Sequence, residues 1–63
     1  MRDRFLVEID LERLAERLLY DDQTVEEFLA FEGFIETETG WLCDAVALAR
    51  LDRDEVISHR RVD

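Results

Sequence analysis

The segment over residues 24–33 has the most sharply defined ends in the chain, and it constrains what can lie on either side. Thr24 and Glu27 have the spacing of a capping box, in which a hydroxyl and a carboxylate each accept a hydrogen bond from a free backbone N–H. Gly33 is placed to end the helix, since glycine adopts the left-handed conformation of a C-terminal cap without strain. The apolar residues in between share one helix face: Val25, Phe28 and Leu29. This pattern predicts a helix with Phe34 folded back onto its last turn.

A strand and a first helix are predicted before this segment. Apolar residues occupy alternate positions over residues 4–9, and a period of two with β-favouring side chains indicates a strand. Asp10 is suited to the N-cap position that follows, because its carboxylate can accept from the free N–H groups of a first helical turn. Leucine and alanine side chains then recur at helical spacing, which predicts a helix over residues 11–20.

The residues after Gly33 predict a small hairpin. Residues 34–39 alternate polar and β-favouring side chains, Gly40 supplies a turn, and Trp41 begins another apolar run. Helix is the alternative for residues 40–50, which leaves two interpretations of this stretch open.

The end of the chain carries two further helix signals. Asp44 can cap a helix that runs through the alanine-rich residues after it. Asp52 and Glu55 repeat the capping-box spacing and lead into Val56. The chain is therefore predicted to end in a C-terminal helix over residues 56–61, with a strand or a frayed end as the alternatives for the last ten residues.

The predicted order of elements is strand, helix, turn, helix, hairpin and helix, which is the order of a small winged helix-turn-helix domain. The similarity extends to these stretches: Leu14-Ala15-Glu16, Asp22-Gln23-Thr24-Val25, Glu32-Gly33-Phe34-Ile35-Glu36 and Thr39-Gly40-Trp41-Leu42. Over about residues 11–48 the chain resembles excisionase-like and phage antirepressor-like modules. We expect one helix-rich α+β domain spanning residues 1–63, with an all-α helical bundle as the alternative.

In modules of that kind the second helix enters the major groove and the wing touches phosphates, and this sequence departs from them in charge. Seventeen acidic residues against eight arginines give a formal net charge of −9. Residues 18–49 hold eight of the acids and no basic residue. Carboxylates repel phosphate oxygens, so DNA binding through the second helix is disfavoured and a basic partner is favoured.

The charge pattern predicts a non-enzymatic protein that binds and inhibits a basic partner. Carboxylates spaced along a rigid scaffold can imitate a row of phosphates and occupy a basic groove that normally holds nucleic acid. Phage-encoded anti-CRISPR and anti-restriction proteins resemble this combination of small size and acidity. The side chains predicted to contact the partner are Asp21, Asp22, Glu26, Glu27, Glu36 and Glu38.

Catalytic, metal and cofactor sites are not expected. The chain has one histidine and one cysteine, His59 and Cys43, too few for a zinc site of three or four nitrogen and sulfur ligands. Ser58 lies next to His59, but adjacent residues on a helix point about 100° apart, so they make no nucleophile and base pair. Cys43 is expected in the core or at an interface.

Two other functions remain open. One is a DNA-binding accessory protein of transcription or recombination that contacts phosphates through these arginines: Arg50, Arg53, Arg60 and Arg61. The other is an antitoxin-like protein that acts through a homodimer. The aromatic residues Phe28, Phe31, Phe34 and Trp41 are expected mainly in the core. A homodimer is favoured, with Phe31 and Trp41 at its interface or with residues 4–9, taken as an edge strand, pairing with a second copy.

The first residues, the lengths of the apolar stretches and the cysteine content together predict the cellular location of the protein. The first residues mix charges into a short apolar run and have no cleavage-site pattern, so no signal peptide is expected. No stretch approaches the 18 apolar residues of a membrane span. A lone cysteine cannot form an internal disulfide, and the prediction is a cytoplasmic protein.

Overall fold

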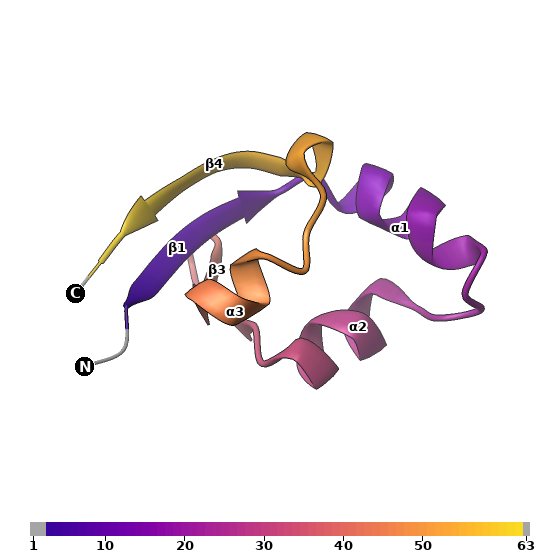
Figure 1. Cartoon of the computed structure of the whole chain (residues 1–63), viewed down its shortest axis with the longest axis horizontal. Helices are drawn as coiled ribbons and strands as arrows, with labels where there is room; N and C mark the ends of the chain where they lie inside the picture. Colours follow the sequence, from indigo (N-terminus) through magenta and orange to yellow (C-terminus); the bar gives the residue numbers. More distant parts are fainter. Residues whose placement is uncertain (1–2, 63) are drawn as a thin grey trace.

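The computed structural model describes residues 3–62, which form three helices and a four-stranded antiparallel sheet (Figure 1). In chain order the elements are β1 (Arg4–Ile9), α1 (Leu11–Leu19), α2 (Val25–Glu32), β2 (Ile35–Glu36), β3 (Trp41–Asp44), α3 (Ala45–Leu48), the 3-10 turn η1 (Arg53–Glu55) and β4 (Val56–Arg61). The predicted α+β class is confirmed, and the all-α alternative is wrong. Among the described residues, no helix is long and apolar enough to cross a membrane.

The first part of the chain folds as its local signals indicate. The carboxylate of Asp10 accepts from the backbone N–H of Arg13 and caps α1. Thr24 and Glu27 form both hydrogen bonds of the predicted capping box at the start of α2. Gly33 ends α2 in the left-handed region, with φ of 90°. The strand over residues 4–9 is also present as predicted.

The sheet has the strand order β2, β3, β1, β4, so β1 lies in its interior. The expectation that residues 4–9 form an edge strand is wrong, because β3 pairs along one side of β1 and β4 along the other. The predicted C-terminal helix is also wrong. Asp52 and Glu55 do form a capping box, but it closes only the single turn η1, and Val56 then starts β4.

Residues 40–50, for which a hairpin strand and a helix were the two predictions, contain both. Trp41–Asp44 forms β3 and completes the hairpin with β2, and the Asp44 carboxylate then caps α3 by accepting from the Ala47 backbone N–H. Gly40 is required at the hairpin because a Cβ there would come within 2.6 Å of the Val7 carbonyl oxygen. This close approach sets the turn of the hairpin directly beside β1, an interior strand of the sheet.

One face of the sheet carries the core. Val7 and Ile9 on β1 and Cys43 on β3 are buried there with side chains from all three helices: Leu14, Leu18, Phe28, Leu29 and Ala47. Figure 1 shows α3 in front of the strands, with α1 and α2 beyond the end of β1. The alternate side chains of β1 and β3, Leu6 and Leu42, are not part of this core cluster, so they lie on the opposite face.

The aromatic side chains divide between the core and the surface. Phe28 and Phe34 are buried, and the half-buried Trp41 packs against the core, as predicted. The same prediction is wrong for Phe31, which is 83% exposed because it lies on the side of α2 that faces away from the core.

Candidate functional site

The six acids predicted to bind a partner are all exposed, and they fall into two groups. Asp21 and Asp22 lie in the turn between α1 and α2, and Glu26 and Glu27 lie in the first turn of α2. We call these four residues the acidic corner. Figure 1 places this turn at the end of the molecule farthest from the two chain ends.

Glu36 and Glu38 form the second group, on β2 and in the loop that joins β2 to β3. They follow the C-terminal end of α2, whereas the acidic corner precedes or begins it. A helix of eight residues is about 12 Å long, so this distance separates the two groups along the helix axis.

Backbone hydrogen bonds hold the turn of the acidic corner in place. The N–H groups of Asp21 and Gln23 both donate to the Leu18 carbonyl oxygen, at 3.0 and 3.2 Å. Asp22 adopts a positive φ of 53°, a conformation that aspartate tolerates better than most residues. Glu26 and Glu27 lie at the N-terminal end of α2, where the helix dipole favours negative charge.

None of the six acids forms an ion pair with another described residue. The ion pairs within residues 3–62 involve a different set of acids: Asp3, Asp10, Glu32, Asp52, Asp54 and Glu55. The structure therefore pairs four arginines with acids elsewhere and leaves the six candidate side chains exposed, with no ion-pair partner among the described residues.

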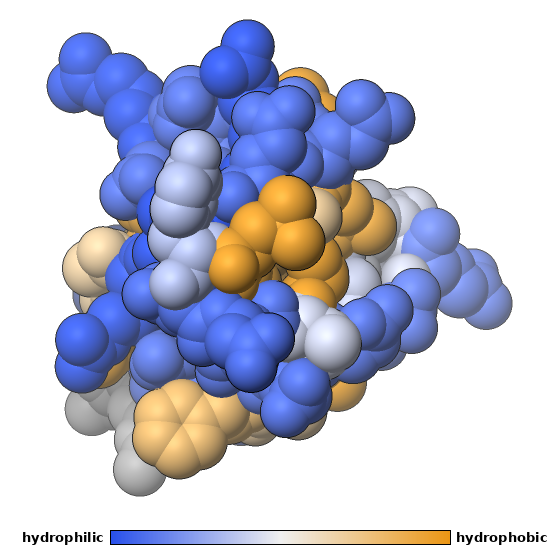
Figure 2. Space-filling view, turned by 90° about the vertical axis from the view of Figure 1, so that its right-hand side faces the viewer, coloured by the Kyte–Doolittle hydropathy of each residue, from blue (hydrophilic) through white to orange (hydrophobic). Residues whose placement is uncertain are grey.

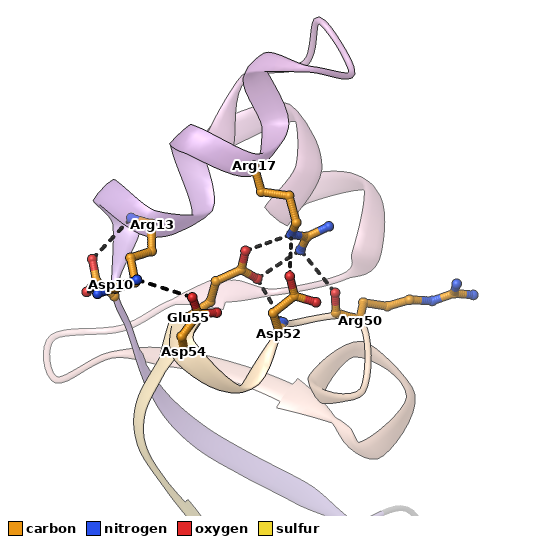
Figure 3. Close-up of polar contacts among 7 residues, drawn as sticks. All are labelled: Asp10, Arg13, Arg17, Arg50, Asp52, Asp54 and Glu55. Atoms are coloured by element: carbon orange, nitrogen blue, oxygen red, sulfur yellow. Dashed lines mark hydrogen bonds and ion pairs between the residues drawn. The ribbon is translucent and has the colours of Figure 1, made fainter.

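The most elaborate ionic contact joins α1 to η1, and we call it the Arg17 clasp (Figure 3). The Arg17 Nε atom lies 2.6 Å from Glu55 Oε2, and Nη2 donates to Glu55 Oε1 at 2.9 Å. Nη2 also donates to the Arg50 carbonyl oxygen at 3.2 Å, and Asp52 approaches Nε at 3.3 Å. The guanidinium lies 5.4 Å from the centre of the Phe28 ring, which extends the clasp to α2.

Glu55 is only 2% exposed, and its ionisation depends on the clasp. Burial opposes its charged form, but the hydrogen bonds from Arg17 and from the Asp52 backbone N–H, with the Arg17 charge, hold the pKa of Glu55 below its ordinary value. The hydrogen bond to Glu55 is the main reason that the pKa of Arg17 is raised. The ion pair between Arg17 and Glu55 links α1 to η1, directly before β4.

Three carboxylates of this region come close enough to suggest a cation site, since oxygens of Asp52, Asp54 and Glu55 lie within 4.8 Å of one another. Arginine side chains already contact all three carboxylates. Arg13 Nη1 donates to Asp54 at 3.2 Å, and Arg17 contacts the other two carboxylates. The positive charge that a cation would supply is provided by these guanidinium groups.

The residues considered for catalysis are dispersed. His59 makes an edge contact with the Phe5 ring, with 6.1 Å between centroids, while Ser58 precedes it on β4 and points to the other face of the sheet. Cys43 is buried in the core, where burial, with the Asp44 charge, raises the pKa of its thiol to about 11. A thiol with this pKa is a poor nucleophile near neutral pH.

The arginines considered for DNA binding are exposed, and two of the four have acidic partners. Arg50 Nε lies 3.6 Å from Glu32, and Arg61 donates to Asp3. Arg60 and Arg61 are consecutive on β4, so their side chains point to opposite faces of the sheet.

The largest exposed apolar side chains include two that the sequence analysis did not select. Tyr20 is 93% exposed and Leu19 is 77% exposed, both at the end of α1 beside the acidic corner. Figure 2, which views that end of the molecule, shows an apolar patch surrounded by hydrophilic side chains. Of the two predicted interface residues, Phe31 is exposed, whereas Trp41 is half-buried and packs against the core. Leu19 lies one residue after the buried Leu18 on α1, outside the buried face of the helix, and this position is the sequence signal that could have identified it as exposed.

No family model, no curated protein and no solved structure matches this chain, so its function is argued from its own residues.

Proposed function

We propose that this protein is a non-enzymatic regulator that binds a basic surface of another protein through its acidic corner. The observation that carries the proposal is the difference in pairing. Six exposed acids on α2, its preceding turn and the hairpin have no ion-pair partner among the described residues, and four of them fall within residues 21–27. Six acids elsewhere are paired with arginine, and the other exposed acids without an ion pair in the described chain, Glu8, Glu12 and Glu16, lie on β1 and α1. Unpaired surface charge of one sign accelerates encounter with a surface of the opposite sign and selects for it.

The mechanism is occupancy. A partner that normally binds nucleic acid presents basic side chains at the positions of phosphates, and the acidic corner meets them with carboxylates instead. A partner that also contacts Glu36 and Glu38 must present basic groups over about 12 Å, the length of α2. The chain therefore competes with nucleic acid, in the manner of phage-encoded inhibitors such as anti-CRISPR and anti-restriction proteins.

A competition experiment tests this proposal. Fluorescent duplex DNA is bound by a basic DNA-binding protein at low salt, and the chain is then added. We expect the wild-type chain to displace the DNA, and the double variant Asp21→Arg/Glu26→Arg to fail. Glu27 is left unchanged because it belongs to the capping box of α2.

The matched control is Glu12→Arg/Glu16→Arg, which makes the same change in net charge at two exposed acids of α1 that form no ion pair with a described residue. This control variant is expected to retain most of the competition. Equal loss in both variants means that net charge alone acts, and retained competition in the corner variant overturns the proposal.

A second candidate function is a DNA-binding accessory protein, as the resemblance to winged helix-turn-helix modules implies. It is supported by Arg53 and Arg60, exposed side chains for which no acidic partner is found within residues 3–62. The same assay without the basic protein separates the two functions. Direct binding to the duplex that weakens steeply with salt favours this candidate.

A third candidate is an antitoxin-like partner that acts through apolar contacts. The exposed Phe31 supports it. Binding of this kind survives high salt and is lost on Phe31→Ala. Binding through the acidic corner instead weakens as the salt concentration rises, because salt screens exposed charges.

A further inference from the structure

Two large exposed side chains at the end of α1 adjoin the acidic corner. Leu19 is the last residue of α1 and is 77% exposed, and Tyr20 follows it as the C-cap and is 93% exposed. Asp21 and Asp22 come directly after them in the chain. Figure 2 views this end of the molecule and shows apolar surface with hydrophilic side chains around it. We call Leu19 and Tyr20 the apolar pair.

The core does not use the apolar pair. The buried residues of α1 are Leu14 and Leu18, and the pair lies outside that face of the helix. Tyr20 makes no aromatic or cation–π contact within residues 3–62. A single exposed apolar side chain is ordinary, but contiguous apolar surface with a polar rim marks contact sites, and tyrosine is enriched among the residues that dominate binding energy there. The pair is therefore available to a partner.

Hydrogen bonds and the Arg17 clasp hold the backbone of the pair in place. The Tyr20 N–H donates to the Arg17 carbonyl oxygen at 3.4 Å, and the Asp22 N–H donates to the Leu19 carbonyl oxygen at 3.4 Å. The Arg17 side chain is bonded in turn to Glu55. A surface that is already ordered loses less conformational entropy when a partner binds. The apolar pair and the acidic corner are thus presented together on one ordered segment of backbone.

We propose that the apolar pair and the acidic corner together bind a basic protein segment that also carries apolar side chains. This inference rests on the proposed function and specifies the chemistry of the partner. Lysine or arginine side chains of the segment face the carboxylates of the acidic corner, and a neighbouring aliphatic or aromatic side chain is buried against Leu19 and Tyr20. The charges attract the segment, and the apolar contact selects it from other basic surfaces.

The adjoining charges disfavour other occupants of the apolar pair. A nucleic acid base can stack on a tyrosine ring, but the acids next to Tyr20 repel the phosphates that come with it. An anionic lipid surface is repelled for the same reason. Two copies of this chain that met at the apolar pair would bring their acidic corners together. A cationic segment with apolar side chains is the occupant that suits both parts of the surface.

Two fluorescent peptides test the proposal. Both carry the same number of lysines, and the remaining positions are leucine in one peptide and serine in the other. Fluorescence anisotropy measures their binding to the full chain at low and at moderate salt. The wild-type chain is expected to bind the leucine peptide at least about tenfold more tightly than the serine peptide, which corresponds to about 1.4 kcal/mol. This ratio should change little with salt, because salt screens the charges that both peptides share.

The variant Leu19→Gln/Tyr20→Gln removes the apolar pair and leaves the net charge of −9 unchanged. Both positions are exposed and glutamine is a good helix former, so the fold is retained. This variant is expected to bind both peptides about equally, as weakly as the wild type binds the serine peptide. The matched control is Phe31→Gln/Val46→Gln, which removes an aromatic and an aliphatic side chain that are 83% and 67% exposed on α2 and α3. The control is expected to bind both peptides as the wild type does.

Equal affinity of the wild type for the two peptides overturns the proposal, and so does an equal loss in the variant and its control. If the two peptides bind equally and Asp21→Arg/Glu26→Arg abolishes their binding, the apolar contact is wrong while the proposed function stands. If neither peptide binds at low salt, the acidic corner does not attract basic segments, and the proposed function fails as well. Binding of fluorescent duplex DNA that is lost in Leu19→Gln/Tyr20→Gln also overturns the proposal, because nucleic acid is then the occupant.

Discussion

The Arg17 clasp and the acidic corner are both rich in carboxylates, yet the chain treats their charges in opposite ways. In the clasp, Glu55 is buried and ionised because Arg17 donates two hydrogen bonds to it. In the acidic corner, Asp21, Asp22, Glu26 and Glu27 are exposed and form no ion pair with a described residue. Carboxylates that stabilise the fold are neutralised inside the molecule, and carboxylates left unpaired at the surface are available to a partner.

The largest expected effect comes from breaking the clasp. Glu55→Ala removes the buried member of the pair and both hydrogen bonds that it accepts from Arg17, which leaves the guanidinium with the exposed Asp52 carboxylate and the Arg50 carbonyl oxygen. Because breaking a buried ion pair is strongly destabilising, this variant is expected to lower the free energy of unfolding by about 3 kcal/mol. This value is at the lower end of the usual range because the Arg17 side chain is 32% exposed. Urea denaturation followed by circular dichroism measures the loss, and a change below about 1 kcal/mol contradicts the role given to the clasp.

The clasp also predicts how stability depends on pH. The pKa of Glu55 is lowered in the folded chain, so its contribution is fully present above the unfolded value of 4.5 and is lost as the pH falls through the folded value. The difference in unfolding free energy between the wild type and Glu55→Gln should therefore shrink as the pH is lowered below 4.5. Denaturation at a series of pH values checks this, and a difference that stays constant down to low pH argues against an ionised Glu55.

A smaller effect is expected where the acidic corner itself contributes to the fold. Thr24→Ala removes the hydroxyl that accepts from the Glu27 backbone N–H at 3.1 Å, and the loss of such a cap costs about 1 kcal/mol. Thr24→Ser retains the hydroxyl and serves as the control. Equal stability of the alanine and serine variants in thermal unfolding contradicts the role of this cap.

The smallest effect on stability is expected from the unpaired acids. Asp21→Asn/Glu26→Gln removes two charges that have no ion-pair partner within residues 3–62, so the unfolding free energy should change by no more than about 0.5 kcal/mol. The same denaturation series measures it beside Glu55→Ala. A large loss in this variant would mean that the acidic corner is part of the stabilising structure and would remove the contrast between the two regions.

The first half of the fold was predictable because its signals are local. Asp10, the capping box of Thr24 and Glu27, and Gly33 each act within four residues along the chain, and each appears where it was expected. Exposure of the six candidate acids was also predictable from their positions in turns and on the outer side of a helix. The separation of these acids into two groups, one at each end of α2, was not predictable in the same way, because it depends on how α2 packs against the sheet.

The second half depended on contacts between distant residues. Asp52 and Glu55 have the same spacing as a helix-starting capping box, yet the chain after them extends because β1 offers a free side for β4, about 50 residues earlier in the sequence. The same pairing moves β1 from the edge to the interior of the sheet. Arg17 and Glu55 lie 38 residues apart, so no local pattern indicates that they meet.

The most direct test of the central claim is to locate where a basic protein binds. The ¹⁵N-labelled chain is titrated with a basic DNA-binding protein, and amide chemical shifts are followed by NMR. We predict that the largest changes fall at residues 21–27, with smaller changes at Glu36 and Glu38 and little change on α1 around Glu12 and Glu16. Changes of equal size at all exposed acids, or changes centred on β4, would contradict the assignment of the acidic corner as the binding surface.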